Sequence, residues 1–216
     1  WRECACWKTV RPRHASFWRT LFETSEFAEK LFQIFLSEGF LEDRIISEYK
    51  KECSDFKFHP KDMARLITGE DEEKYLNIIQ KIDDIYGDCS KMLYEESVNF
   101  LEKIPRDKYS INMLTMGDPD FQKRKVDNSG LLKYFENVYY SEVQKWDFLD
   151  NLVDQNERFL IVDDRPDTMQ RVLEKFKNSF PIQIFRQKDF DNDPVRIVAD
   201  YQGLRVNNLM QILEHL

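Results

Sequence analysis

The sequence is poor in the residues that break or cross-link a chain, with only 6 glycines, 7 prolines and 4 cysteines in 216 residues. Few glycines and prolines beside a charged fraction of 33% are typical of a helix-rich globular protein. The cysteines form no CxxC pair and no dense framework, so the spacing favours neither a zinc site nor a disulfide scaffold. We therefore expect a reducing compartment, the cytoplasm.

Long apolar stretches are missing as well. The longest apolar runs are far shorter than a membrane span, and residues 1–20 lack the apolar core of a signal peptide. The net charge of −8 argues against broad nucleic-acid binding, which requires a basic surface to displace counterions. A small phosphorylated substrate remains compatible with this charge, because a metal ion or a lysine can reverse the sign within one pocket.

The pattern along the chain divides it into three parts. Residues 1–19 hold three of the four tryptophans and show neither a helical nor an alternating period, so no element is predicted there. Residues 20–105 read as several amphipathic helices with no strand. From Tyr109, short apolar strands alternate with helices: strands are predicted within SINMLTMG, ENVYYS, RFLIVDD and PIQIFRQ, and a closing helix at NLMQILEHL. This alternation predicts an α/β fold with a parallel sheet covered by helices on both faces.

Polar groups follow the predicted strands, where the ligands of such sheets bind. Thr115 lies at the end of the first strand, Asp163 and Asp164 end the third, and Lys145 begins a helix between them. A hydroxyl, an ammonium and two carboxylates at one sheet edge suit a phosphate group with a divalent cation. Each residue alone has a simpler explanation, since threonines form turns, helix lysines are solvated and aspartates cap helices.

Three segments together resemble the haloacid dehalogenase-like (HAD) hydrolase superfamily. INMLTMGD matches its second motif with Thr115, YYSEVQKWDFL its third with Lys145, and FLIVDDRPD its fourth with Asp163 and Asp164. The resemblance implies a three-layer, Rossmann-like core from residues 1–24 and 106–216, with residues 25–105 as a helical cap. It also implies Mg²⁺-dependent hydrolysis of a small phosphorylated compound. Thr115, Met116, Gly117 and Lys145 would then bind phosphate, Asp163 and Asp164 would hold Mg²⁺, and Asp167 would support them or simply begin the next helix.

The first motif of the family, an apolar strand followed by DxDxT, is not matched. Thr20, Leu21 and Phe22 fit its continuation, which places Ser16 and Trp18 where the nucleophilic and the acid/base aspartates belong. Serine is a much weaker nucleophile without a neighbouring base, and tryptophan neither transfers a proton nor binds magnesium. The sequence therefore predicts an impaired phosphatase.

Two explanations of the unmatched motif stay open. The chain is a pseudoenzyme, a non-catalytic binding or regulatory protein, or residues 1–19 are not the natural N-terminus. A response-regulator receiver is disfavoured, because its lysine follows its acidic pair, whereas Lys145 precedes Asp163.

Overall fold

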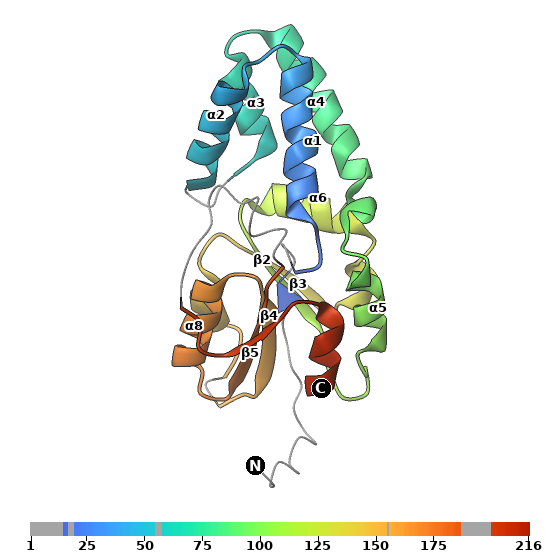
Figure 1. Cartoon of the computed structure of the whole chain (residues 1–216), viewed down its shortest axis with the longest axis vertical. Coiled ribbons are helices and arrows are strands. Elements are labelled where there is room, and N and C mark those ends of the chain that lie inside the picture. Colours follow the sequence, from blue (N-terminus) through green and yellow to red (C-terminus); the bar gives the residue numbers. More distant parts are fainter. Residues whose placement is uncertain (1–14, 17–19, 55–57, 155, 187–199) are drawn as a thin grey trace.

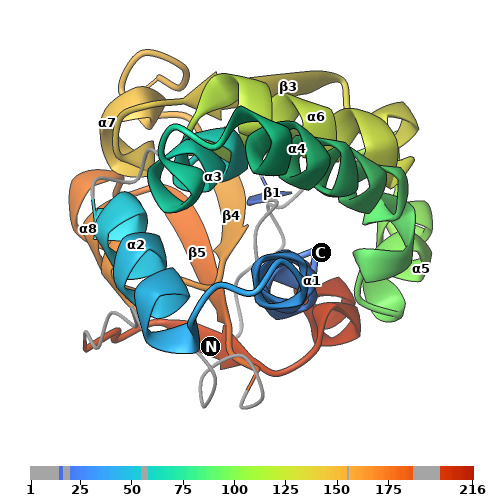
Figure 2. The ribbon, with the colours of Figure 1, turned by 90° about the horizontal axis from the view of Figure 1, so that it is seen from above.

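The computed structural model describes residues 15–16, 20–54, 58–154, 156–186 and 200–216. Its centre is a six-stranded sheet with the order β3-β2-β1-β4-β5-β6, in which every described strand pair is parallel (Figures 1 and 2). The strands are β1 (Ala15–Ser16), β2 (Asn112–Met116), β3 (Asn137–Ser141), β4 (Phe159–Asp163), β5 (Ser179–Ile184) and β6 (Leu204–Val206).

Helices cover both faces of the sheet. One face packs against α5 (Glu96–Lys103), α6 (Pro119–Ser129), the 3₁₀ turn η2 (Leu132–Tyr134) and the 3₁₀ helix η3 (Leu209–His215), and the other against α7 (Lys145–Leu149) and α8 (Pro166–Lys175). Alternation along the strands produces this division, because consecutive side chains point to opposite faces. In β2, for example, Met113 belongs to the first core and Leu114 to the second. The predicted three-layer α/β fold is confirmed.

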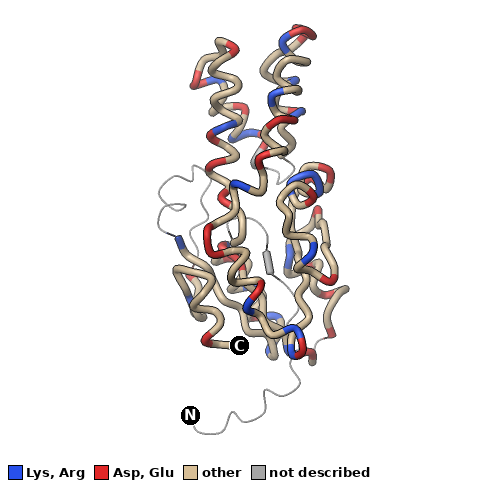
Figure 3. The backbone as a smooth tube through the Cα atoms, turned by 90° about the vertical axis from the view of Figure 1, so that its right-hand side faces the viewer, with Lys and Arg blue, Asp and Glu red and all other residues tan. Residues whose placement is uncertain are grey.

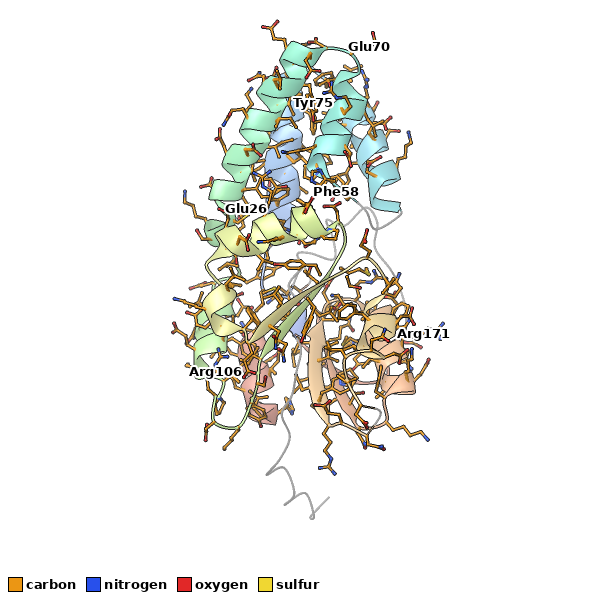
Figure 4. The ribbon with its side chains drawn as sticks, turned by 180° about the vertical axis from the view of Figure 1, so that it is seen from behind. Glu26, Phe58, Glu70, Tyr75, Arg106 and Arg171 are labelled. Carbon is orange, nitrogen blue, oxygen red and sulfur yellow. The ribbon has the colours of Figure 1, made fainter. Side chains whose placement is uncertain are left out.

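Four helices form a separate layer above one edge of the sheet (Figure 1). They are α1 (Thr24–Ser37), α2 (Glu42–Ser54), α3 (Pro60–Thr68) and α4 (Glu72–Gly87). Phe27 and Phe35, part of an aromatic stripe in the sequence, are buried in the core shared by this layer and α6. Phe58 lies at the base of the layer, with its ring centroid 5.6 Å from that of Phe121 in α6 (Figure 4). The helical layer therefore rests on α6 through aromatic packing.

After α4 the chain returns through the 3₁₀ turn η1 (Cys89–Met92) to α5, which lies beside η3 against the sheet rather than in the helical layer. The predicted boundary of the cap at residue 105 stays a prediction.

Figure 3 shows lysine and arginine interleaved with aspartate and glutamate along the tube. Among the described residues, no helix is long and apolar enough to cross a membrane.

Four elements differ from the sequence prediction. Ala15 and Ser16 form a strand where none was expected, because the edges of β2 and β4 supply hydrogen-bonding partners that no local pattern shows. The short strand β6 was missed, and it pairs with β5 in the same way. The closing helix is a 3₁₀ helix, and the helix expected after β3 is limited to the five residues of α7.

Candidate active site

The carboxyl ends of three neighbouring strands meet at the centre of the sheet. Ser16 of β1 pairs with Leu114, the residue before Thr115 in β2. On its other side, Ala15 pairs with Val162, the residue before Asp163 in β4. The backbone register therefore brings the end of β1 between the two strand ends that carry predicted site residues. Trp18 lies outside the described residues.

Lys145 and Asp163 form a buried ion pair at this edge. Lys145 is the first residue of α7, and its ammonium lies 2.5 Å from Oδ2 of Asp163. The side chains are 5% and 0% exposed, respectively. The other carboxylate oxygen of Asp163 accepts a hydrogen bond from the backbone N–H of Arg165, at 2.8 Å. Both oxygens of Asp163 are therefore engaged by positive or donating groups, as a buried carboxylate requires.

The turn after β4 contains a second pair of opposite charges. Arg165 donates from Nε and Nη2 to the two carboxylate oxygens of Asp167, at 3.1 and 2.5 Å. Burial lowers the pKa of Arg165, but the hydrogen bond and charge of Asp167, with the charges of Asp163 and Asp164, outweigh it and raise the pKa above its usual value. Asp167 lies in the first turn of α8 and binds Arg165, while its supporting role in a metal site stays a prediction.

Asp164 is half-buried, and its backbone carbonyl accepts a hydrogen bond from Nε2 of Gln183 in β5, at 3.0 Å. Gln183 in turn accepts from Nε of Arg205 in β6, at 2.8 Å. This chain of contacts fixes the backbone of the acidic turn to the two strands beside it. Arg165 and Gln183 are polar groups of the site that the sequence interpretation missed. The signal available for Arg165 was its position directly after the aspartate pair.

The end of β2 is held by internal hydrogen bonds. The fully buried hydroxyl of Thr115 donates to Oε1 of Gln122 in α6, at 3.0 Å. Gly117 has a φ of 129°, a conformation that side chains rarely adopt, and its N–H donates to the carbonyl of Ser141 at 3.0 Å. Met116 between them is half-buried. Thr115 therefore lies at the predicted strand end, but its hydroxyl already has a partner there.

A residue of the helical layer also reaches the end of β2. Asp118 caps α6 by accepting from the N–H of Phe121 at 2.8 Å. Nε2 of His59 lies 4.0 Å from the same carboxylate oxygen, while its Nδ1 accepts from the N–H of Lys61 at the start of α3. His59 is the N-cap residue of α3. Its second contact links α3 to the loop after β2.

The described residues do not by themselves fit a magnesium ion. Asp163 and Asp164 supply carboxylates of the kind that hard cations prefer. However, no group of three or more histidine, cysteine or acidic side chains within the described ranges is placed to hold a metal. Lys145 and the Arg165 N–H also occupy the carboxylate of Asp163. A magnesium ion at this position would need further oxygen donors.

No family model matches the sequence, and no curated protein matches it. Solved structures do match its fold. A protein described as a haloacid dehalogenase-like hydrolase, from Burkholderia xenovorans, superimposes with a TM-score of 0.74 at 14% identity, over 95% of this chain and 96% of that one. The chain has the haloacid dehalogenase-like fold.

Two further structures show how broad this similarity is. A protein described as a HAD-hydrolase, from Bacillus subtilis and bound to magnesium, gives a TM-score of 0.62 at 14% identity, over 96% of this chain and 99% of that one. The L-2-haloacid dehalogenase of Xanthobacter autotrophicus gives 0.64 at 12% identity, over 96% and 100%. The haloacid dehalogenase-like fold expected from the three sequence motifs is thus confirmed. Identities this low establish the fold alone.

Proposed function

We propose that this chain is a hydrolase of the haloacid dehalogenase-like type whose site binds the phosphate of a small phosphorylated compound, and whose turnover is impaired. The buried Lys145–Asp163 pair beside the end of β1 carries the proposal. A lysine held at 5% exposure in an ion pair with Asp163 is a costly arrangement for stability alone, because both charges must be desolvated. A site that binds an anion explains why a fixed cation is kept there.

The proposed roles follow from the chemistry of each group. Lys145 neutralises phosphate charge and orients the group, while Asp163 holds the ammonium in place. Thr115 and the turn at Met116 and Gly117 would donate to phosphate oxygens. For Thr115 this requires its hydroxyl to exchange the hydrogen bond that it now makes to Gln122. A Mg²⁺ ion held by Asp163, Asp164 and further oxygen donors would offset phosphate charge.

The impairment follows from the residue at the end of β1. Ser16 ends this central strand. In the haloacid dehalogenase-like hydrolases that the sequence resembles, hydrolysis starts from a carboxylate nucleophile at this position. A serine hydroxyl attacks slowly unless a base removes its proton. The same observation favours the second candidate, a non-catalytic protein that uses the strand ends to bind a partner or ligand.

Turnover of an aryl phosphate with and without Mg²⁺ distinguishes the two. We expect little or no turnover by the unaltered chain, and more turnover by the variant that carries both Ser16→Asp and Trp18→Asp. Adding Lys145→Ala or Asp164→Ala to that variant should abolish the gain. Lys177→Ala, which changes an exposed lysine, is the matched control and should leave it intact.

The possible outcomes separate the hypotheses. No turnover in the restored variant would refute the phosphatase proposal and support a non-catalytic role. High turnover by the unaltered chain that is lost in Lys145→Ala would refute the proposed impairment and leave the phosphatase proposal standing. Because several of the similar structures are named as dehalogenases, one of them with chloropropionic acid covalently bound, halide release from 2-chloropropionate should be measured in parallel. Halide release without phosphate release would assign the other reaction class.

A further inference from the structure

The helical layer is joined to the sheet by two segments that pair with each other. The chain enters the layer through residues 20–23 and leaves it through residues 92–97, which together are called the hinge below. Phe22 and Leu93 form an antiparallel bridge. The N–H of Glu23 donates to the carbonyl of Met92 at 2.7 Å, and the N–H of Tyr94 donates to that of Leu21 at 3.1 Å. The two segments of the hinge therefore form one hydrogen-bonded unit.

Arg186 connects this unit to the sheet. Arg186 follows β5 by two residues, and the preceding N–H, that of Phe185, donates to the carbonyl of Val206 in β6. Nη2 of Arg186 donates to the backbone carbonyl of Thr20 at 3.0 Å and to Oε1 of Glu96 at 2.7 Å. Its guanidinium carbon lies 3.6 Å from the centroid of the Tyr94 ring. Arg186 thus contacts both segments of the hinge from a third part of the chain.

These contacts are shielded from water, which makes them stronger than an exposed ion pair. The side chains of Arg186 and Glu96 are 11% and 17% exposed, and Thr20 is fully buried. Charge-assisted hydrogen bonds and a cation over an aromatic face both gain strength as water is excluded. The planar guanidinium matches this set of partners, because it can stack on a ring while donating at its edge.

The position of Thr20 links this contact to the candidate active site. Thr20 lies four residues after Ser16, so its carbonyl belongs to the segment that connects the end of β1 to the helical layer. A displacement of Thr20 would move the start of α1, which begins at Thr24. Arg186, in the C-terminal half of the chain, donates a hydrogen bond to this carbonyl.

We propose that Arg186 is a positioning residue that clamps the hinge, including the backbone of Thr20, against the carboxyl end of β5. The clamp sets the placement of the helical layer over the strand ends. It acts through Thr20, Tyr94 and Glu96, and it does not depend on whether the chain has hydrolytic activity.

Hydrogen–deuterium exchange of the full chain, read by mass spectrometry, tests the clamp. With Arg186→Ala we expect peptides covering residues 20–23 and 92–97 to exchange about tenfold faster or more, because charge-assisted hydrogen bonds to both segments are lost. Peptides from β2 and β4 should keep their rates. Arg186→Lys keeps the charge but not the planar group, so we expect a smaller increase at the same peptides.

Arg106→Ala is the matched control. Arg106 donates to the carbonyls of Tyr134 and Leu101 at 2.6 and 3.3 Å, and Figure 4 places it at the end of the molecule opposite the helical layer. Its loss should leave the exchange of the hinge unchanged. Unaltered hinge exchange in Arg186→Ala, or an equal increase in all peptides, would overturn the proposal. If Arg186→Ala does not fold, Arg186→Lys and Glu96→Gln decide it, with a rise confined to the hinge as the supporting result and unaltered hinge exchange as the refuting one.

Discussion

The buried pair of Lys145 and Asp163 allows a quantitative test of the site. Replacing Lys145 by methionine keeps most of the side-chain volume and removes the charge that faces Asp163 at 2.5 Å. The carboxylate then stays buried at 0% exposure, and among the described residues the N–H of Arg165 is its remaining donor. Removing one partner of a buried pair costs about 3–5 kcal/mol, since the remaining charge is desolvated without compensation.

This loss is large beside a total stability of about 5–15 kcal/mol. With a urea dependence of about 2–3 kcal/mol per molar, the midpoint of urea unfolding should fall by roughly 1–2 M. Asp163→Asn should also destabilise the fold, because it leaves the ammonium of Lys145 buried. The double variant removes both charges, so we expect it to be more stable than the sum of the single changes by about 1–3 kcal/mol.

Circular dichroism in urea at pH 7 measures all three variants. Arg65→Met is the matched control, because it breaks an exposed ion pair with Glu72 at 2.8 Å and should leave the midpoint unchanged. A loss below about 1 kcal/mol in Lys145→Met, or strict additivity in the double variant, would refute the reasoning. Either result would show that the two charges are not desolvated, although their burial indicates that they are.

Two further predictions concern the core beneath the helical layer. Lys125 of α6 is fully buried, with its ammonium 4.4 Å from the Phe22 ring centroid, and burial lowers its pKa well below the usual value. The unfolded chain therefore binds more protons than the folded chain between the two pKa values, so stability rises with pH in that window. Lys125→Met should stabilise the protein by about 1–3 kcal/mol at pH 7, and this gain should shrink as the pH approaches the pKa of free lysine. A gain in urea unfolding that is absent, or that stays constant with pH, would contradict this. Burial also raises the pKa of Cys89 to about 11, so in a background with the other three cysteines changed to serine, iodoacetamide at pH 8 should modify it about 100-fold more slowly than a peptide thiol. Modification at the peptide rate would show that the thiol is accessible.

Local signals were sufficient for most of the second half of the chain. The short apolar runs before Thr115 and Asp163 predicted β2 and β4, because both faces of a parallel strand are buried and the sequence shows it directly. Lys145 was expected at the start of a helix, and α7 begins there.

Elements that depend on partners were not predictable in this way. A two-residue strand such as Ala15–Ser16 has too little length to show a period, and it exists because β2 and β4 leave a place between them. The segment from Cys89 to Lys103 has helical periodicity throughout, yet it is interrupted at Leu93. The competing interaction there is the bridge to Phe22, more than 70 residues earlier in the chain.

By itself the sequence determined the alternation of strands and helices after Tyr109, the helical nature of the preceding segment and the polar residues at the strand ends. These follow from hydrophobic periodicity and residue chemistry, which act over a few neighbours. Tertiary structure alone decided that Ser16 reaches the centre of the sheet, that the ammonium of Lys145 is committed to Asp163, and that Arg186 meets Thr20. Each of these contacts joins segments far apart in the chain, and its existence depends on the whole fold bringing them together.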